Sequence, residues 1–207
     1  MERSDGIRKF LKIAWVYELF QAIACGRSGM TWLCANHWKI EPGMLVVDVG
    51  CGTAKLRSQF PEDIKYYGFD PNVAYIESAK DKDVELVAGG ITEFLQEFGE
   101  GLAGKIDVVV CSGVLHHLTS EQVGQILNGA NLLLKPGGRF AALEPAFLVR
   151  QDRFSRWILE QDRGTNILYD YEWRKEMEAV FDSVDIRVAN NLIRIPYMYA
   201  LITAWKE

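Results

Sequence analysis

The sequence has few of the features that mark several large classes of protein. Among its 207 residues only four are cysteines, and these form no C-x-x-C motif and no cluster with a histidine, so neither a disulfide scaffold nor a metal site is expected. No apolar run approaches the roughly 20 residues that span a bilayer, and residues 10–25, the most apolar early stretch, lack the layout of a signal peptide. We therefore expect a cytoplasmic protein without stable membrane insertion.

Positive charge is also scarce. The 23 lysines and arginines are outnumbered by 28 acidic residues, which gives a formal net charge of −5. A domain that holds nucleic acid through its phosphates needs a positive field, so a nucleic-acid partner is not expected and a small-molecule partner is favoured. With 49% apolar and 25% charged residues, the chain fits one globular domain over residues 1–207.

Short apolar runs alternate with helical stretches through most of the chain. Strands are predicted at 44–49, 65–69, 84–88, 106–111 and 139–144, and helices at 72–79, 91–98 and 121–134. This order predicts a doubly wound α/β fold with five parallel strands. Strands at 183–188 and 198–205 are joined by too short a link for a crossover, so they add an antiparallel terminal pair and complete a seven-stranded mixed sheet. We expect residues 1–40 to form a helical lid, 41–144 a cofactor-binding core, 145–175 a substrate cap and 176–207 the terminal strands.

A glycine turn follows the first predicted strand, in the sequence Val-Val-Asp-Val-Gly-Cys-Gly-Thr-Ala at 46–54. Gly50 and Gly52 let the backbone turn sharply and approach a ligand, and a helix is expected to follow. A dinucleotide-binding fingerprint needs a third glycine where this chain has Lys55, so the spacing opposes NAD or FAD.

Two aspartates stand at the ends of the first two predicted strands. Asp48 precedes the glycine turn, where it can orient the loop and meet an ammonium group directly or through water. Asp70 ends the second strand, where a carboxylate accepts hydrogen bonds from the vicinal hydroxyls of a ribose. Together they predict a ligand that joins a ribose to an amino acid.

With these motifs the chain resembles the class I S-adenosylmethionine-dependent methyltransferases, in the branch that acts on small molecules. The resemblance covers residues 41–145 and rests on 46–53, 68–71, 107–118 and 134–140. It implies a Rossmann-like methyltransferase fold and S-adenosyl-L-methionine as cofactor, with S-adenosyl-L-homocysteine as product. It implies cofactor-binding roles for Tyr17, Asp48, Gly50, Cys51, Gly52, Asp70, Pro71, Gly90, Ile91, Cys111 and Ser112.

The chain departs from the family after the third strand. There the family often places an acidic residue that accepts from the adenine amino group, whereas this chain has Gly90. Thr92, Glu93, water or the backbone must then take over, and Ile91 offers its amide and an apolar surface.

Candidates for catalysis and acceptor binding follow the core motifs. His116 and His117 come after the fourth strand, and a base is needed only where the attacking O–H or N–H must lose a proton. We favour His117 by alignment with methyltransferases that use a histidine there; the alternative is that both histidines only support the start of a helix. In the predicted cap, Arg163 and Tyr171 are the candidates for binding an anionic acceptor, against a solvated cap with local ion pairs.

Other functions stay open. Tyr171 and Lys175 form a Tyr-x-x-x-Lys pattern like that of short-chain dehydrogenases, although the glycine turn is wrong for that family. A protein substrate, or cofactor binding without activity, is also compatible with the sequence. The prediction is methyl transfer to a small, anionic or neutral, organic acceptor at O, N or C by a monomer or homodimer.

Overall fold

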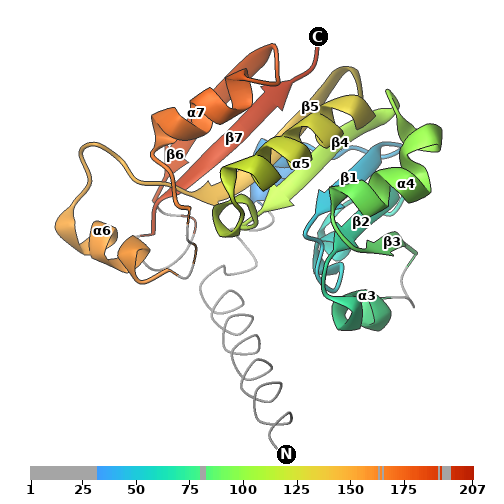
Figure 1. The fold of residues 1–207 in the computed structure, drawn as a ribbon, viewed down its shortest axis with the longest axis horizontal. Coiled ribbons are helices and arrows are strands. Elements are labelled where there is room, and N and C mark those ends of the chain that lie inside the picture. The colour runs from blue at the N-terminus through green and yellow to red at the C-terminus, as the bar shows by residue number, and fades with distance from the viewer. Residues whose placement is uncertain (1–31, 80–82, 163, 165, 191, 193–196) are drawn as a thin grey trace, which may run out of the picture.

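The computed structural model describes residues 32–207, apart from 80–82, 163, 165, 191 and 193–196 (Figure 1). Tyr17, most of the predicted lid and Arg163 therefore lie outside the described residues. Among those described, no helix is long and apolar enough to cross a membrane.

A seven-stranded sheet forms the centre of the molecule, in the order β3-β2-β1-β4-β5-β7-β6. All neighbouring pairs up to β5 are parallel, whereas β7 runs antiparallel to both β5 and β6. The predicted doubly wound mixed sheet is confirmed. The strands are β1 (Leu45–Val49), β2 (Lys65–Asp70), β3 (Glu85–Ala88), β4 (Ile106–Ser112), β5 (Leu134–Pro145), β6 (Ser183–Ala189) and β7 (Tyr199–Trp205).

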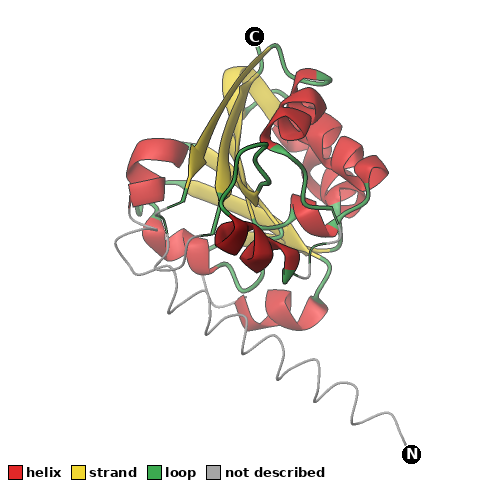
Figure 2. Cartoon of the chain, turned by 90° about the vertical axis from the view of Figure 1, so that its left-hand side faces the viewer, coloured by secondary structure: helices red, strands yellow, loops and turns green. Residues whose placement is uncertain are grey.

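Helices cover both faces of the sheet (Figure 2). In Figure 1, α4 (Ile91–Leu102), α5 (Ser120–Leu133) and α7 (Asp170–Glu178) follow one another across the near face, and α6 (Arg153–Glu160) stands to one side. The π-helix η1 (Cys34–Trp38) and the helix α3 (Val73–Ala79) contribute to the core on the other face. Two 3₁₀ helices, η2 (Lys55–Gln59) and η3 (Leu115–His117), follow the ends of β1 and β4.

The buried strands explain why the sequence shows continuous apolar runs. Val46 and Val47 of β1 are both 0% exposed, yet they belong to the cores on opposite faces of the sheet. A strand with helices on both sides buries both of its faces, so apolar residues need not alternate with polar ones. This arrangement places the loops that follow β1, β2, β3, β4 and β5 at one edge of the sheet, where ligands bind in open α/β folds.

Three predicted elements differ from the structure, among them α4, which ends at Leu102 rather than at Phe98. The segment after the glycine turn forms only the five-residue 3₁₀ helix η2, because Ala54 takes a left-handed conformation (φ 53°) that delays helix formation. The strand β5 begins at Leu134 rather than Arg139, since Leu134 already pairs with Ile106 before a register shift. The Lys-Pro-Gly-Gly sequence that follows Leu134 has the composition of a turn, so the pattern did not predict this extension.

Candidate functional site

The glycine turn between β1 and η2 uses its two glycines differently. Both have positive φ, 66° at Gly50 and 54° at Gly52. A Cβ on Gly50 would lie 2.6 Å from a methyl group of Val114, so this glycine allows the loop after β4 to pack close. A Cβ on Gly52 would meet no atom of the described residues within 4 Å, so within that part of the chain space is open in front of this backbone. Cys51 fixes the turn to β2, because its N–H donates to the Phe69 carbonyl (3.1 Å).

Asp70 joins the end of β2 to the same turn. Its Oδ2 accepts a hydrogen bond from the Gly52 amide (3.0 Å) and its Oδ1 accepts from the Asn72 amide (2.8 Å). A carboxylate offers about four acceptor positions, so both oxygens retain capacity for ligand hydroxyls. The carboxylate and the open side of Gly52 therefore leave acceptors and space for the ligand predicted from the sequence, a ribose joined to an amino acid. Pro71, the next residue, is exposed at this edge.

Asp48 is buried, with 2% of its surface exposed, and accepts a hydrogen bond from the Tyr66 hydroxyl. Burial raises its pKa to about 7, against the opposite effect of the tyrosine hydrogen bond. Burial and the neighbouring carboxylate likewise raise the pKa of Tyr66. The sequence analysis did not identify Tyr66. Strand register was the available signal, because Val46 pairs with Tyr66 and side chains two residues apart share a face, which places Asp48 diagonally beside it.

The expected adenine end of the site lies between β3 and α4. The Glu93 carboxylate accepts from the Gly90 amide (2.8 Å), and this bond lowers its pKa. Ile91 is 6% exposed and packs so closely against α5 that a Cβ on Gly129 would lie 2.4 Å from it. The apolar surface expected from Ile91 is thus used inside the protein, and its amide is the part left at the start of α4.

Cys111 and Ser112, the two predicted cofactor-binding residues at the end of β4, differ in their exposure. Cys111 is 0% exposed, and its Sγ lies 3.7 Å from Glu144 Oε1. Burial, with the charge of Glu144, raises the pKa of this thiol well above its usual range. Ser112 is half-buried at the strand end, and Gly113 then turns the chain at φ 67°. Contact from Cys111 to a ligand at the edge is therefore limited to its backbone.

Glu144 at the end of β5 was not identified from the sequence. It is 0% exposed, and its carboxylate accepts from the amides of Val114 (2.9 Å), Leu115 (2.9 Å) and His116 (3.3 Å). It also accepts from Nδ1 of His116 (2.7 Å). A buried charge requires this number of donors. The Glu-Pro pair that ends an otherwise apolar strand was the signal available in the sequence.

The two candidate histidines are in contact but differ in exposure. His116 is 2% exposed, whereas His117 lies at the surface. Their ring centroids are 3.9 Å apart with 43° between the planes. Partial burial against this neighbour, followed by the positive charge of His116, lowers the pKa of His117. Within the part of the chain that the structure describes, no group of three or more potential ligands is arranged to hold a metal ion.

The described part of the cap carries mostly local interactions. Tyr171 is 56% exposed and stacks on Tyr169, with 5.4 Å between centroids and 21° between planes. Arg156 lies over the Phe147 ring and pairs with Glu160 at 3.1 Å. This pairing matches the alternative of a solvated cap for Arg156. Arg163 lies outside the described residues.

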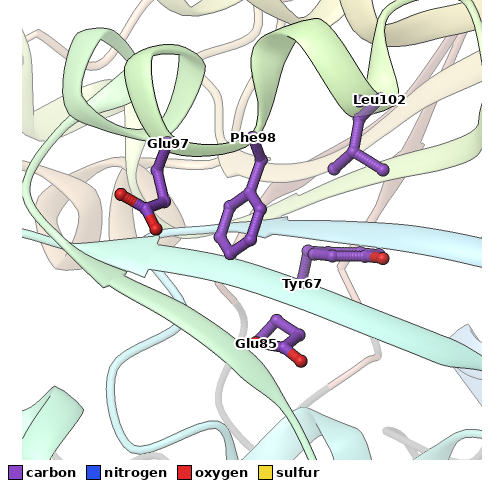
Figure 3. Close-up of a pocket in the computed structure, with 6 residues that line it drawn as sticks. Tyr67, Glu85, Glu97, Phe98 and Leu102 are labelled. Atoms are coloured by element: carbon purple, nitrogen blue, oxygen red, sulfur yellow. The ribbon is translucent and has the colours of Figure 1, made fainter.

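A cavity of about 340 Å³ lies away from these residues (Figure 3). It is lined by Tyr67, Glu85, Glu97, Phe98, Gly101 and Leu102. Figure 3 shows Phe98 and Leu102 pointing from α4 toward β2, where the Phe98 and Tyr67 rings meet edge to face at 5.4 Å. The lining residues of α4 come from its last two turns, the end opposite Gly90. The cavity is therefore separate from the site formed by the glycine turn and Asp70.

Comparison with known proteins places this site in a family. The family described as "Methyltransferase domain" matches residues 47–140. An uncharacterized methyltransferase of Geobacillus sp. (strain WCH70) is 35% identical over 135 residues, 63% of this chain and 61% of that protein. Another, of Synechocystis sp., is 31% identical over 150 residues, 70% of this chain and 66% of that protein. The chain thus spans about two thirds or less of the length of these relatives.

A solved structure extends the likeness to the whole fold. The 1,6-didemethyltoxoflavin-N1-methyltransferase of Burkholderia thailandensis superposes with a TM-score of 0.67 at 18% identity, covering 99% of this chain and 86% of that one. That protein was crystallised with 1,6-didemethyltoxoflavin and S-adenosylhomocysteine. The solved structure shows a shared fold. From the matched domain and the two relatives, the chain belongs to the methyltransferase family.

Proposed function

We propose that the protein transfers a methyl group from S-adenosylmethionine to a small organic acceptor. The observation that carries this proposal is the Asp70 carboxylate held against the Gly52 amide, with open space in front of Gly52. The bound cofactor supplies an electrophilic methyl group on a sulfonium for in-line displacement. Because such a leaving group is good, the protein mainly has to align the reactants, and alignment alone provides effective molarities of about 10⁵ M or more.

Each residue of the site has a role that follows from its position. Asp70 holds the ribose hydroxyls and keeps the glycine turn in place, and Gly52 lets the cofactor approach the backbone. Asp48 balances the ammonium group of the cofactor, although its burial beside Tyr66 favours contact through water. The amide of Ile91 and the half-buried Ser112 complete the adenine side and the sulfonium side.

His117 is the candidate base for acceptors that must lose a proton. It lies at the surface just after β4, and its lowered pKa keeps the imidazole neutral and able to accept a proton near pH 7. The 1,6-didemethyltoxoflavin bound by the Burkholderia protein supports a small-molecule acceptor. An anionic group on the acceptor, held by the cap through Arg163 or Tyr171, remains part of this proposal, as does an O, N or C atom of the acceptor as the nucleophile that attacks the methyl carbon.

Calorimetry with S-adenosylhomocysteine tests the cofactor directly. We expect one site, and we expect Asp70→Ala to weaken binding by about 10- to 100-fold, since hydrogen bonds to a charged group contribute roughly 1.5–3 kcal/mol. Asp185→Ala, which removes a carboxylate from the surface of β6, is the matched control and leaves binding unchanged. Absence of binding to the wild-type chain contradicts the proposal. Binding without turnover of S-adenosylmethionine across a panel of small acceptors points instead to a protein that binds cofactor without activity.

A further inference from the structure

A buried polar cluster joins the cap to the end of β4. We propose that His116 is a positioning residue that fastens the cap, residues 145–175, to the sheet edge through Glu144 on one side and Asp162 on the other. It would act on the reaction by fixing the acceptor side of the site, in contrast to His117, which faces the surface. Its role in catalysis rests on the proposed function, but its role as a fastening does not.

The core half of the cluster is rigid. Glu144 accepts from three consecutive backbone amides of η3 and its approach, and from Nδ1 of His116 at 2.7 Å. Both partners are almost fully enclosed, with side-chain exposures of 0% and 3%. Because a buried carboxylate that loses a donor pays a large desolvation cost, the imidazole is held in one orientation.

The cap half meets the other edge of the same ring. Asp162 Oδ1 lies 3.6 Å from Nε2 of His116, within ion-pair distance. The same carboxylate accepts from the Gly164 amide of the cap (2.7 Å) and from the hydroxyl of Tyr197, just before β7 (2.5 Å), so both bonds orient it. Two residues beyond Gly164, the Asn166 amide donates to the His116 carbonyl at 2.9 Å, which adds a backbone bond between cap and core.

The backbone of Gly164 leaves no room between cap and ring. A Cβ on this residue would lie 2.2 Å from Cδ2 of His116 and 3.1 Å from its carbonyl oxygen. Real Cβ atoms do not approach so closely, and the ring is held by Glu144, so glycine is required for the cap to seat here. The polar contacts and this close fit together make His116 a contact point between the cap and the core.

The hydrogen-exchange rate of the Asn166 amide, measured on the full chain, reports how often the contact between the cap and the core opens. Asp162→Asn and His116→Asn each remove the contact between the imidazole and the Asp162 carboxylate, and the asparagine at 116 keeps a donor where Nδ1 faces Glu144. We expect each variant to speed exchange of the Asn166 amide by about tenfold or more through local opening, while amides of β1 and β4 stay protected. Asp152→Asn is the matched control. It alters the N-cap of α6 inside the same cap but not the contact with His116, and it leaves Asn166 unchanged.

The same variants separate this inference from the proposed function. Affinity for S-adenosylhomocysteine should stay within about twofold of wild type in Asp162→Asn, because Asp70 and the glycine turn are untouched. Unchanged Asn166 exchange in both variants overturns the inference even if the cofactor binds. If exchange rises but the wild-type chain binds no S-adenosylhomocysteine, the fastening stands and the proposed function fails. Opening of the whole molecule in Asp162→Asn, rather than of the cap alone, also contradicts a positioning role.

Discussion

At the scale of the residue, the carboxylate of Asp48 is buried in surroundings that disfavour its charged form. Its pKa of about 7 in the folded protein exceeds the value of about 3.9 for an unfolded chain. Between about pH 4 and 7 the unfolded chain releases the proton that the folded chain keeps, so stability falls as the pH rises through this range and is constant above it. Asp48→Asn, which can still accept from Tyr66, removes this penalty.

The expected result is an unfolding free energy that improves relative to wild type as the pH goes from 4 to 8. The gain is at most about 4 kcal/mol, from three pKa units at roughly 1.36 kcal/mol each. Urea unfolding at several pH values measures it, with Asp185→Asn as the surface control. We also expect weaker S-adenosylhomocysteine binding in Asp48→Asn. A difference in stability that does not vary with pH contradicts the raised pKa.

The titration of His117 provides a second test at this scale. Three charged groups act on it: His116 lowers its pKa, whereas Asp162 and Glu144 raise it. We therefore expect opposite effects from two neighbouring substitutions, a higher pKa for His117 in His116→Asn and a lower one in Asp162→Asn. Nuclear magnetic resonance titration is simple to assign because the chain has only three histidines. Shifts of the same sign in both variants contradict the arrangement.

Tyr66 and Glu144 were missed by the sequence analysis for the same physical reason. Asp48 and Asp70 stand in motifs whose chemistry depends on adjacent residues, so the sequence shows them. Tyr66 and Glu144 act across strands, 18 residues from Asp48 and 28 from His116 along the chain. Their roles depend on which strands pair and in what register, and composition does not carry that information.

At the scale of the element, the contact between α4 and α5 depends on a missing side chain. A Cβ on Gly129 would lie 2.4 Å from Ile91, whereas one on Gly124, in the same helix, would meet nothing within 4 Å. We expect Gly129→Ala to destabilise the protein by about 1–3 kcal/mol through overpacking, less the gain in helix propensity. Gly124→Ala should instead stabilise it by up to about 1 kcal/mol.

Thermal unfolding of the two variants compares these effects within one helix. Because Ile91 begins α4, we also expect Gly129→Ala, but not Gly124→Ala, to weaken S-adenosylhomocysteine binding. Equal stability of the two variants would show that α4 moves freely to accommodate the extra methyl group, and that the α4–α5 contact does not fix the start of α4.

Elements were predicted well where one local pattern dominated. The buried strands and the long helix α5 have strong patterns and differ by a few residues at most, apart from the start of β5. The segment after Gly52 was predicted as a helix because a helix commonly follows a strand and a glycine turn, but the structure has the left-handed Ala54 and then the short 3₁₀ helix η2. The cap was predicted only as partly helical, since its packing against Met198 and Tyr199, at the start of β7, depends on contacts far apart in sequence.

At the scale of the whole molecule, the sheet brings the site together from loops that are distant in the chain. The turn after β1, the aspartate of β2, the start of α4 and the loop after β4 meet at one edge, and Glu144 and Asp162 join the cap to that edge. A ligand that contacts several of these loops stabilises the fold as a unit. Cofactor binding should therefore raise the stability of the entire domain.

Thermal unfolding with added ligand tests this coupling and the dehydrogenase alternative together. At a concentration 100 times its dissociation constant, S-adenosylhomocysteine should add about 2.7 kcal/mol, which for a chain of this size raises Tm by roughly 5–10 °C. NADH at the same concentration should leave Tm unchanged, because the turn has Lys55 in place of the third glycine. Asp70→Ala should reduce the shift with S-adenosylhomocysteine to about half or less, because its affinity is 10- to 100-fold weaker, whereas Asp185→Ala keeps the full shift. A larger shift with NADH would favour the Tyr171 and Lys175 pattern on α7 as a dehydrogenase site.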